Sequence, residues 1–369
     1  MEKAKISSIQ FFLLLFMFEL GTAVVVARGI EARKDSWLSI LLGLSAGLIL
    51  FLVYHRLFRY YPSLPLTAYA RKIFGTYIGW VVGFMYTILF LYTSARNVRE
   101  FSEVLITATM PEIPLLVVIV LFVLTICYVL LLGIEVFART AEILGIFLIF
   151  VGIIGNLFVY VTGTVDPNNL KPVLEYGWKP VLETTFSPPL LVIFPFAEAI
   201  VFAMLFPYLN RAEVVKKAGL ASLIVSGLIL SYTAALNIAV LGVSEVERSP
   251  FPLLATVGKI NFLEFIQRLD ALVVITLLIT VFFKAGIYLY ASVTGMVDLF
   301  RLKNHRQMIL PAGLILVFLS VGIAEDFAEH SQEGFTIFIT YFSAPLLIVL
   351  PLVMLMIAFI RHRFTKQRN

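Results

Sequence analysis

The chain has 369 residues, of which 60% are hydrophobic and only 14% are charged, and its mean hydropathy is +0.98. A soluble domain is nearer half apolar and a quarter charged, so this composition indicates an integral membrane protein. The net charge of +5 is not gathered into one basic patch, which argues against a nucleic-acid partner, and the single Cys127 excludes a disulfide framework.

The patterns of an enzyme are missing from the sequence. It contains no phosphate-binding loop, no nucleophile–base constellation and no spacing typical of metal ligands. We therefore expect a protein that is not an enzyme and that needs neither a cofactor nor a metal.

Ten hydrophobic stretches approach the roughly 20 residues that a helix needs to cross the ~30 Å hydrocarbon core of a bilayer. The first is longer than the core of a secretory signal and contains Glu19, so we interpret it as a retained span. The predicted fold is all-α, with one transmembrane domain over residues 1–369. The spans are Ile6–Ala27, Trp37–Tyr54, Tyr77–Ile106, Ile113–Leu132, Ala141–Val161, Pro189–Tyr208, Gly219–Leu241, Phe265–Leu299, Ile309–Ile323 and Phe335–Phe359.

The first span is interrupted near its middle by polar and flexible residues. Gly21 permits the backbone angles of a break, and a half-helix beginning near Thr22 would offer N–H groups and a positive dipole end to an anion. Glu19 suits an ammonium group or a proton, because charged residues inside spans are costly and usually functional. The alternative for Glu19 is a hydrogen bond to a neighbouring helix. The predicted ligand-binding residues are Glu19, Leu20, Gly21 and Thr22.

The third span carries a charged face at its outer end. Arg96 and Glu100, and likewise Arg99 and Glu103, are four residues apart and can pair along the helix. We predict that this face meets the charged start of the eighth span and forms an outer gate or a brace. The alternative is interfacial charge that snorkels to water. The predicted gate residues are Arg96, Arg99, Glu100 and Asp270, with Glu264 and Arg268 at similar depth.

The chain divides into two halves of five spans each. The first half is residues 6–161, residues 162–188 form an external connecting loop, and the second half is residues 189–359. An odd number of spans in each half inverts the second repeat relative to the first. Two interrupted spans in corresponding positions are the best sequence pointer to the substrate site of an inverted-repeat transporter fold. The sequence therefore predicts a fold like that of LeuT, with helices 1 and 6 broken at mid-membrane.

The sixth span contains the second interruption. Pro195 removes a backbone donor and breaks the helical hydrogen-bond ladder, and Glu198 follows three residues later. A break opposite another broken span must line a cavity or meet a ligand, because lipid cannot satisfy the exposed backbone groups. A proline kink without a ligand is the alternative. The predicted ligand-binding residues here are Phe194, Pro195, Phe196, Ala197 and Glu198.

Lys284 is the only lysine deep inside a span, near the middle of the eighth. An isolated ammonium group would be expensive there, so Lys284 is predicted to pair with Glu19 or Glu198 or to lose its proton. With these two carboxyl groups, it could replace a coupling sodium ion or carry a proton. A purely structural salt bridge is the equal alternative.

The basic residues of the short loops predict the orientation. With the N-terminus in the cytoplasm, seventeen lysine and arginine residues lie on that side and seven on the other, and four lie inside spans, which accounts for all 28. The positive-inside rule then places both termini in the cytoplasm.

Several short motifs in a fixed order resemble the B subunits of bacterial spore germinant receptors, in the amino acid–polyamine–organocation transporter superfamily. The resemblance covers the whole chain and depends on the order of the motifs more than on any one of them. The motifs are Ile6-Ser7-Ser8-Ile9-Gln10, Asp35-Ser36-Trp37, Tyr61-Pro62, Arg99-Glu100-Phe101, Met110-Pro111-Glu112-Ile113-Pro114, Gly133-Ile134-Glu135-Val136-Phe137-Ala138-Arg139, Phe194-Pro195-Phe196-Ala197-Glu198, and Arg268-Leu269-Asp270 with Lys284.

The resemblance implies a ten-span LeuT-type protein in the inner membrane of a dormant spore. It implies a pocket between spans 1, 3, 6 and 8 for a small nutrient, often an amino acid, and Tyr92 on span 3 is predicted to line it. It also implies partners: a receptor A subunit, a C lipoprotein and membrane lipid.

Three functions remain open from the sequence. The first is a nutrient sensor that signals to partner subunits, and the second is a proton-coupled amino acid transporter that uses Glu19, Glu198 and Lys284. The third is a mainly structural subunit or part of an ion channel. Fold alone cannot separate them.

Overall fold

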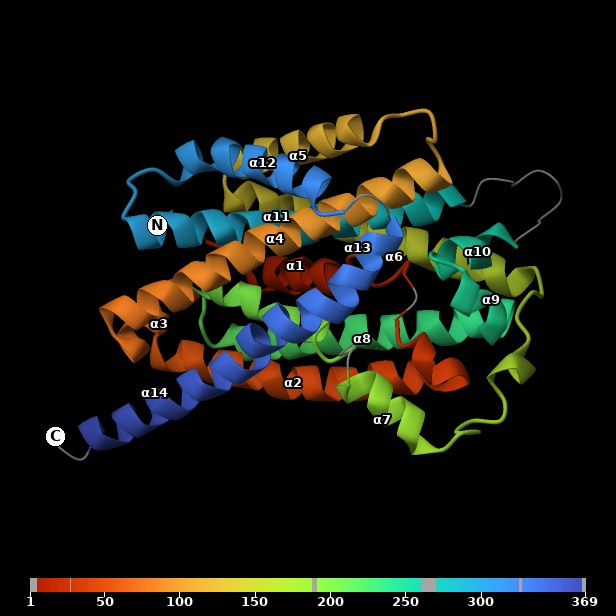
Figure 1. Cartoon of the computed structure of the whole chain (residues 1–369), viewed down its shortest axis with the longest axis horizontal. Helices are drawn as coiled ribbons and strands as arrows, with labels where there is room; N and C mark the ends of the chain where they lie inside the picture. The colour runs from red at the N-terminus through yellow and green to blue at the C-terminus, as the bar shows by residue number, and fades with distance from the viewer. Residues whose placement is uncertain (1–4, 27, 188–190, 260–269, 325–326, 367–369) are drawn as a thin grey trace.

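The structure is a computed structural model that describes residues 5–26, 28–187, 191–259, 270–324 and 327–366. These residues are almost entirely helical and form a bundle of long helices that run along one direction (Figure 1). The α-helices are α1 Ser8–Leu20, α2 Ser36–Tyr60, α3 Leu66–Phe74, α4 Thr76–Ala108, α5 Leu115–Leu132, α6 Ile134–Val161, α7 Trp178–Phe186, α8 Val214–Leu241, α9 Val243–Arg248, α10 Pro252–Gly258, α11 Asp270–Phe300, α12 His305–Gly322, α13 Phe327–Gln332 and α14 Leu350–Lys366. The 3₁₀-helices are η1 Ile30–Asp35, η2 Pro167–Leu170, η3 Phe196–Met204 and η4 Phe206–Tyr208, and the π-helices are η5 Glu333–Ser343 and η6 Pro345–Val349.

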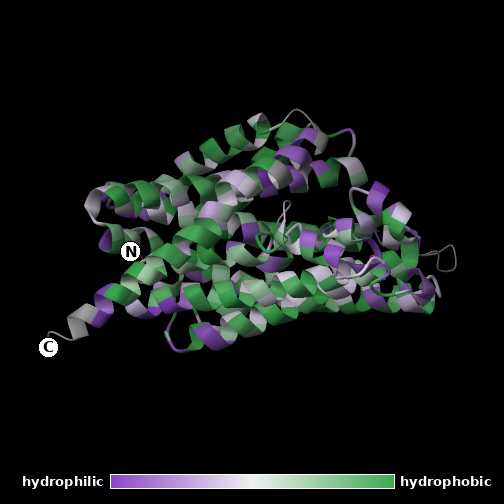
Figure 2. Cartoon of the chain, turned by 60° about the horizontal axis from the view of Figure 1, so that its bottom comes forward, coloured by the Kyte–Doolittle hydropathy of each residue, from purple (hydrophilic) through white to green (hydrophobic). Residues whose placement is uncertain are grey.

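Eight helices within the described residues are long and apolar enough to cross a membrane. They correspond to eight of the ten predicted spans. The other two predicted spans, the first and the sixth, are the interrupted ones, and neither is a continuous long helix. Hydrophobic residues cover the helices along their length, and hydrophilic residues gather mostly at the two ends of the bundle (Figure 2). The protein is therefore a multi-pass membrane protein, while the count of ten spans stays a prediction.

The beginning of α1 and the end of α14 lie toward the same end of the bundle, opposite α7, α9 and α10 (Figure 1). Two contacts fix this arrangement. The N–H of Ile6 donates to the carbonyl of Tyr208, at the start of the segment leading into α8. The ring of Tyr60, at the end of α2, stacks on His362 of α14 at 4.5 Å between centroids.

Local sequence explains where α1 begins and ends. Ser7 and Gln10 form a capping box, in which the Ser7 hydroxyl accepts from the Gln10 N–H at 3.2 Å and the Gln10 side chain accepts from the Ser7 N–H at 2.9 Å. The helix ends at Gly21, which has φ +36° and ψ −130°. Only glycine adopts such angles without steric cost.

The sixth span is wound more tightly than an α-helix. Residues 191–195 form turns, and the 3₁₀-helices η3 and η4 follow them. Gly47 of α2 lies so close to this segment that a Cβ at Gly47 would collide with the Cβ of Phe196. The glycine therefore lets α2 pack directly against the beginning of η3.

Two buried tyrosines stabilise the winding of the last span. Pro351 has no N–H, so the carbonyls that an α- or π-helical N–H would meet there lack a donor. The Tyr54 hydroxyl donates to the Leu347 carbonyl and the Tyr86 hydroxyl to the Leu346 carbonyl, each at 2.6 Å. These side-chain donors replace the missing backbone donor, as a buried carbonyl requires.

Several details differ from the sequence prediction. Helix α3, between spans 2 and 3, was not predicted, and α12 is longer than the predicted ninth span because it begins at His305. Residues 265–269 of the predicted eighth span lie outside the described residues. The boundaries of the two repeats, 6–161 and 189–359, stay a prediction.

The contact between α2 and η3 predicts the effect of a small substitution. Gly47→Ala should lower the thermal midpoint of the purified protein, because overpacking a tight contact costs about 1–3 kcal/mol, which exceeds the ~1 kcal/mol that alanine gains over glycine in a helix. The matched control is Gly152→Ala in α6, where a Cβ meets nothing within 4 Å. Equal midpoints for the two variants in a thermal-unfolding assay would contradict the close contact.

Candidate functional site

The two interrupted spans meet beside α11 in the core of the bundle. The ring centroids of Phe18 and Phe202 lie 5.2 Å apart, which joins the first span to η3. The Thr280 hydroxyl of α11 donates to the carbonyl of Gly21 at 2.9 Å. The aliphatic chain of Lys284 lies directly against Gly21, where a Cβ would collide with it. The break in the first span is thus closed on one side by α11.

Lys284 and Glu198 form a buried ion pair, with 2.5 Å between the lysine Nζ and the glutamate Oε2. This is one of the two pairings that the sequence predicted. The lysine side chain is fully buried, and its Nζ lies 4.4 Å from the ring centroid of Phe194 and 4.8 Å from that of Phe18. Both rings add a cation–π attraction in a desolvated setting. Tyr288, one turn further along α11, is a hydrogen-bonding neighbour of Glu198.

Glu19 lies in the same core and makes no hydrogen bond or ion pair with the described residues. Its side chain is 0% exposed, and neither carboxyl oxygen has a hydrogen-bond partner among the described residues. An ionised carboxyl group in this state is expensive unless a cation or a proton joins it. When ionised, Glu19 and Glu198 carry two negative charges against the one positive charge of Lys284. One further positive charge would therefore neutralise these three groups.

The backbone of the first break adds donors beside this carboxyl group. The N–H groups of Thr22 and Ala23 have no acceptor among the described residues, although the N–H groups of Gly21 and Val24 do. The Thr22 hydroxyl is also buried without a partner in the described part of the chain. A carboxylate or another anion would satisfy these groups. The predicted half-helix is wrong, however, because residues 21–25 form only turns.

The remaining predicted ligand residues fall into different surroundings. Phe194 lies between Lys284 and Arg28, whose guanidinium carbon is 4.6 Å from the ring centroid. Phe196 packs on Gly47, and the Ala197 carbonyl lies 3.2 Å from the Tyr54 hydroxyl, so both are used in packing behind the break. Pro195 precedes η3 as its first flanking residue.

Tyr92 is placed away from the two breaks by its described contacts. Its hydroxyl donates to Glu333 at 3.2 Å, and its ring lies 4.7 Å from that of Phe338. Both partners belong to η5. Tyr92 therefore joins α4 to the beginning of the last span, and its prediction as a pocket residue receives no support from these contacts.

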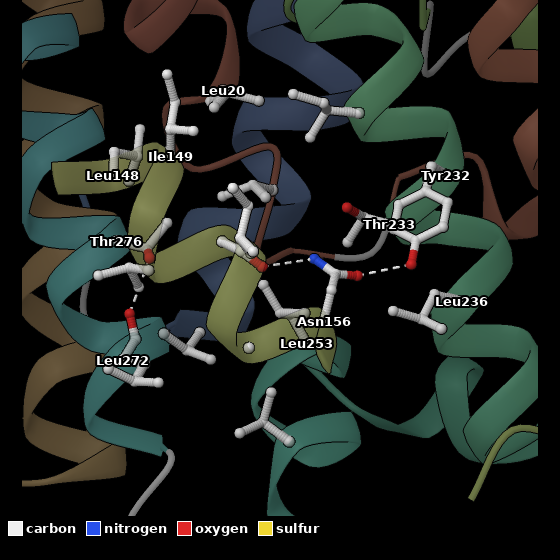
Figure 3. A pocket seen from close by; sticks show the side chains of 18 of the residues that line it. Leu20, Leu148, Ile149, Asn156, Tyr232, Thr233, Leu236, Leu253, Leu272 and Thr276 are labelled. Carbon is white, nitrogen blue, oxygen red and sulfur yellow. Dashed lines mark hydrogen bonds between the residues drawn. The ribbon is translucent and has the colours of Figure 1, made fainter. Parts of the chain in front are cut away.

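Leu20 lines a separate, mainly apolar cavity next to the first break. The cavity has a volume of about 490 Å³ and lies between the first span, α6, α8, α10 and α11 (Figure 3). Its polar groups are neutral, and two of them satisfy each other, since the Tyr232 hydroxyl donates to Asn156 at 2.6 Å. Glu19, Glu198 and Lys284 do not line it. This cavity thus provides apolar space beside the charged core.

The charged face of α4 forms one of its two predicted pairs along the helix, between Arg99 and Glu103, while Arg96 and Glu100 have other partners. Arg99 donates to Glu103 at 2.7 Å and to the carbonyl of Val321 in α12 at 3.2 Å. Arg96 donates to the carbonyl of His330 in α13. Among the described residues no ion pair joins this face to Asp270, and the predicted outer gate or brace stays a prediction. Helices α12 and α13 supply carbonyl acceptors at this depth. Glu264 and Arg268 lie outside the described residues.

Glu100 pairs with a residue that the sequence reasoning missed. Arg28 follows the first break, and its Nη2 lies 3.3 Å from the Glu100 Oε1. The same side chain covers Phe194, so Arg28 connects the first span, the sixth span and α4. Its place directly after a broken span was the available signal. Thr280 and Tyr288 were also missed, but each is four residues from Lys284, which puts all three on one face of α11.

His330 is a buried histidine beside Arg96. Burial lowers the pKa of His330 to about 3, and the nearby Arg96 acts in the same direction. The ring is therefore neutral near pH 7, which avoids a further positive charge beside the arginines of α4.

Comparisons with known proteins agree with this architecture. Residues 5–328 match the family described as Spore germination protein. The chain is 40% identical to Spore germination protein KB of Bacillus subtilis (strain 168) over 358 residues, which is 97% of this chain and 95% of that protein.

Solved structures establish the fold class. Mhp1, a nucleobase-cation-symport-1 family transporter in a closed conformation with bromovinylhydantoin bound, superimposes with a TM-score of 0.71 at 12% identity, over 96% of this chain and 78% of that one. MhsT in complex with L-phenylalanine gives a TM-score of 0.65 at 15% identity, over 97% of this chain and 89% of that one. The fold is therefore that of LeuT-type transporters, and the chain belongs to the spore germination protein family, as a germinant receptor B subunit.

Proposed function

We propose that this protein is the nutrient-sensing subunit of a spore germinant receptor and that a small germinant with an amino group, most simply an amino acid, binds at the two breaks. The observation that carries the proposal is the pair of unsatisfied groups at the first break. Glu19 is a buried carboxyl group without a partner, and the N–H groups of Thr22 and Ala23 lack acceptors among the described residues.

A zwitterion satisfies both kinds of group at once. Its ammonium group supplies the one positive charge that the core lacks when Glu19 and Glu198 are ionised beside Lys284. Its carboxylate accepts from the backbone donors at the first break. The rings of Phe18 and Phe194 flank the ion pair, and they offer apolar surface to the ligand side chain.

Binding converts to signalling through a change in conformational population. A ligand shifts an equilibrium only when it binds one state more tightly than the other. In the described state Lys284 fills the space against Gly21, so a ligand that displaces this side chain favours a different arrangement of the breaks. The change passes to the receptor A subunit and the C lipoprotein in the inner spore membrane, where both termini of this chain face the core.

A second candidate function is proton-coupled transport of an amino acid. The fold favours it, because the structural neighbours are transporters. Lys284 then supplies a fixed positive charge where a coupling cation would bind, and Glu19 carries the proton. Uptake of the germinant by proteoliposomes that contain this protein alone would establish transport. Binding without uptake would instead support the nutrient sensor.

Glu19→Gln should weaken the response to the amino acid that triggers wild-type spores in a panel of amino acids, sugars and nucleosides. A hydrogen bond to a charged group is worth about 1.5–3 kcal/mol, so the half-maximal germinant concentration should rise by roughly 10- to 100-fold. Germination is followed by loss of optical density, with receptor level checked by immunoblot.

The matched control is Glu135→Gln, which removes an exposed carboxyl group of α6 that pairs with Arg139. It should leave the response unchanged. An unaltered half-maximal concentration for Glu19→Gln at normal receptor level would remove Glu19 from the germinant site.

Lys284→Met should reduce the stability of the purified protein, because it leaves Glu198 buried without its cation at a cost of about 3–5 kcal/mol. The double variant Lys284→Met with Glu198→Gln should recover much of the thermal midpoint, since neither charge remains. Recovered stability without a recovered germinant response separates a functional role from a structural one. A single variant with normal stability and a normal germinant response would contradict both roles.

A further inference from the structure

We infer that α2, α8 and α14 form a binding site for one anionic phospholipid at the end of the bundle where α1 begins and α14 ends. A groove of about 500 Å³ lies between these helices. Its cationic lining residues are Arg56, Arg59 and Lys216, and its apolar lining includes Ile49, Leu52 and Leu355. This site is separate from the germinant site and does not depend on the proposed function.

The lining residues of α2 form a stripe with two chemical parts. Ile49, Leu52, Arg56 and Arg59 follow each other at intervals of three, four and three residues, which places them on one helix face. Ile49 is 65% exposed and Leu52 is 39% exposed. The stripe is therefore apolar toward the middle of the bundle and cationic toward its end.

The whole stripe, from Ile49 to Arg59, is short enough to lie within one leaflet of a bilayer. Ten residues of α-helix rise about 15 Å, which is half of a ~30 Å hydrocarbon core. The two arginines follow the apolar part of α2, at the depth where phosphate groups lie. An acyl chain can thus run along Ile49, Leu52 and Leu355 while its phosphate meets the cations.

The described residues provide no counter-ion for the cations of the groove. Within the described part of the chain, Arg56, Arg59 and Lys216 make no ion pair. The guanidinium of Arg56 lies 5.2 Å from the ring centroid of Tyr60, which holds it beside the groove. His55 of α2 also lines the groove, and its charged neighbours are these same three cations from α2 and α8. Three cations without a counter-ion favour a phosphate-bearing occupant.

A second basic cavity at the same end shows the contrast. It has about 560 Å³ and lies beside the segment between α11 and α12. It contains Asp298, which accepts from Arg71 at 2.7 Å and from Thr67 at 2.5 Å. That cavity thus carries an internal counter-charge, and the groove on α2 does not. The exposed apolar stripe below the cations favours a lipid over an acidic peptide, which would leave the stripe uncovered.

The test uses the purified full-length chain, delipidated and then incubated with dioleoylphosphatidylglycerol or dioleoylphosphatidylcholine, with bound lipid counted by native mass spectrometry. We expect one phosphatidylglycerol to bind at least tenfold more tightly than phosphatidylcholine. The triple variant Arg56→Gln, Arg59→Gln, Lys216→Gln should lose this preference. The control variant Arg211→Gln, Lys217→Gln removes two neighbouring charges that do not line the groove and should keep it.

Two further measurements decide the chemistry. If the triple variant does not fold, Arg59→Gln alone should weaken phosphatidylglycerol binding about fivefold, since one basic residue near an anionic surface contributes roughly that factor. Glycerol 1-phosphate, which has no acyl chain, should not compete at equal concentration; equal competition would overturn the lipid assignment. A folded triple variant that keeps the normal lipid preference would also overturn the lipid assignment. If that variant has in addition lost co-purification with a partner subunit, the groove would be assigned to an acidic protein surface.

Discussion

Backbone hydrogen bonding inside the membrane is the constraint on which the rest of this structure depends. A helix interrupted in lipid exposes groups that no solvent can satisfy, so each interruption needs a partner from elsewhere in the fold. The Gly21 carbonyl receives the Thr280 hydroxyl, and the carbonyls before Pro351 receive Tyr54 and Tyr86. The N–H groups of Thr22 and Ala23 lack such a partner among the described residues, which supports the anion site that we propose there.

The buried charges obey the same logic. Lys284 and Glu198 neutralise each other at 2.5 Å in a setting where either group alone would be expensive. Glu19 lies nearby and has no hydrogen-bond or ion-pair partner of its own among the described residues. The proposed site would discriminate among ligands, because a molecule that lacks either an ammonium or an anionic group would leave Glu19 or the N–H groups of Thr22 and Ala23 unpaired.

The sequence predicted those features that depend on composition and local pattern. Long apolar stretches located the eight long helices, and glycine and proline beside glutamate located both breaks. The pairing of Lys284 followed from the cost of a lone charge. What the sequence could not predict depends on tertiary geometry. The rotation of α4 about its axis decides whether Arg99 meets α12 or Asp270, and it carries Tyr92 toward Phe338. Residues 21–25 form turns and no half-helix, because the backbone angles of Gly21 are not helical. Local helix propensity does not predict those angles.

The shared hydroxyl of Tyr54 has a consequence for how distant parts of the chain communicate. It lies 2.6 Å from the Leu347 carbonyl and 3.2 Å from the Ala197 carbonyl, yet a phenol has a single hydrogen to donate. The carbonyls of Ala197 and Leu347 therefore compete for the one hydrogen of the Tyr54 hydroxyl. A movement that brings the Ala197 carbonyl closer to this hydroxyl would therefore weaken the hydrogen bond to Leu347 in the last span. In this way a change in the sixth span, at the centre of the bundle, would reach the last span at its periphery.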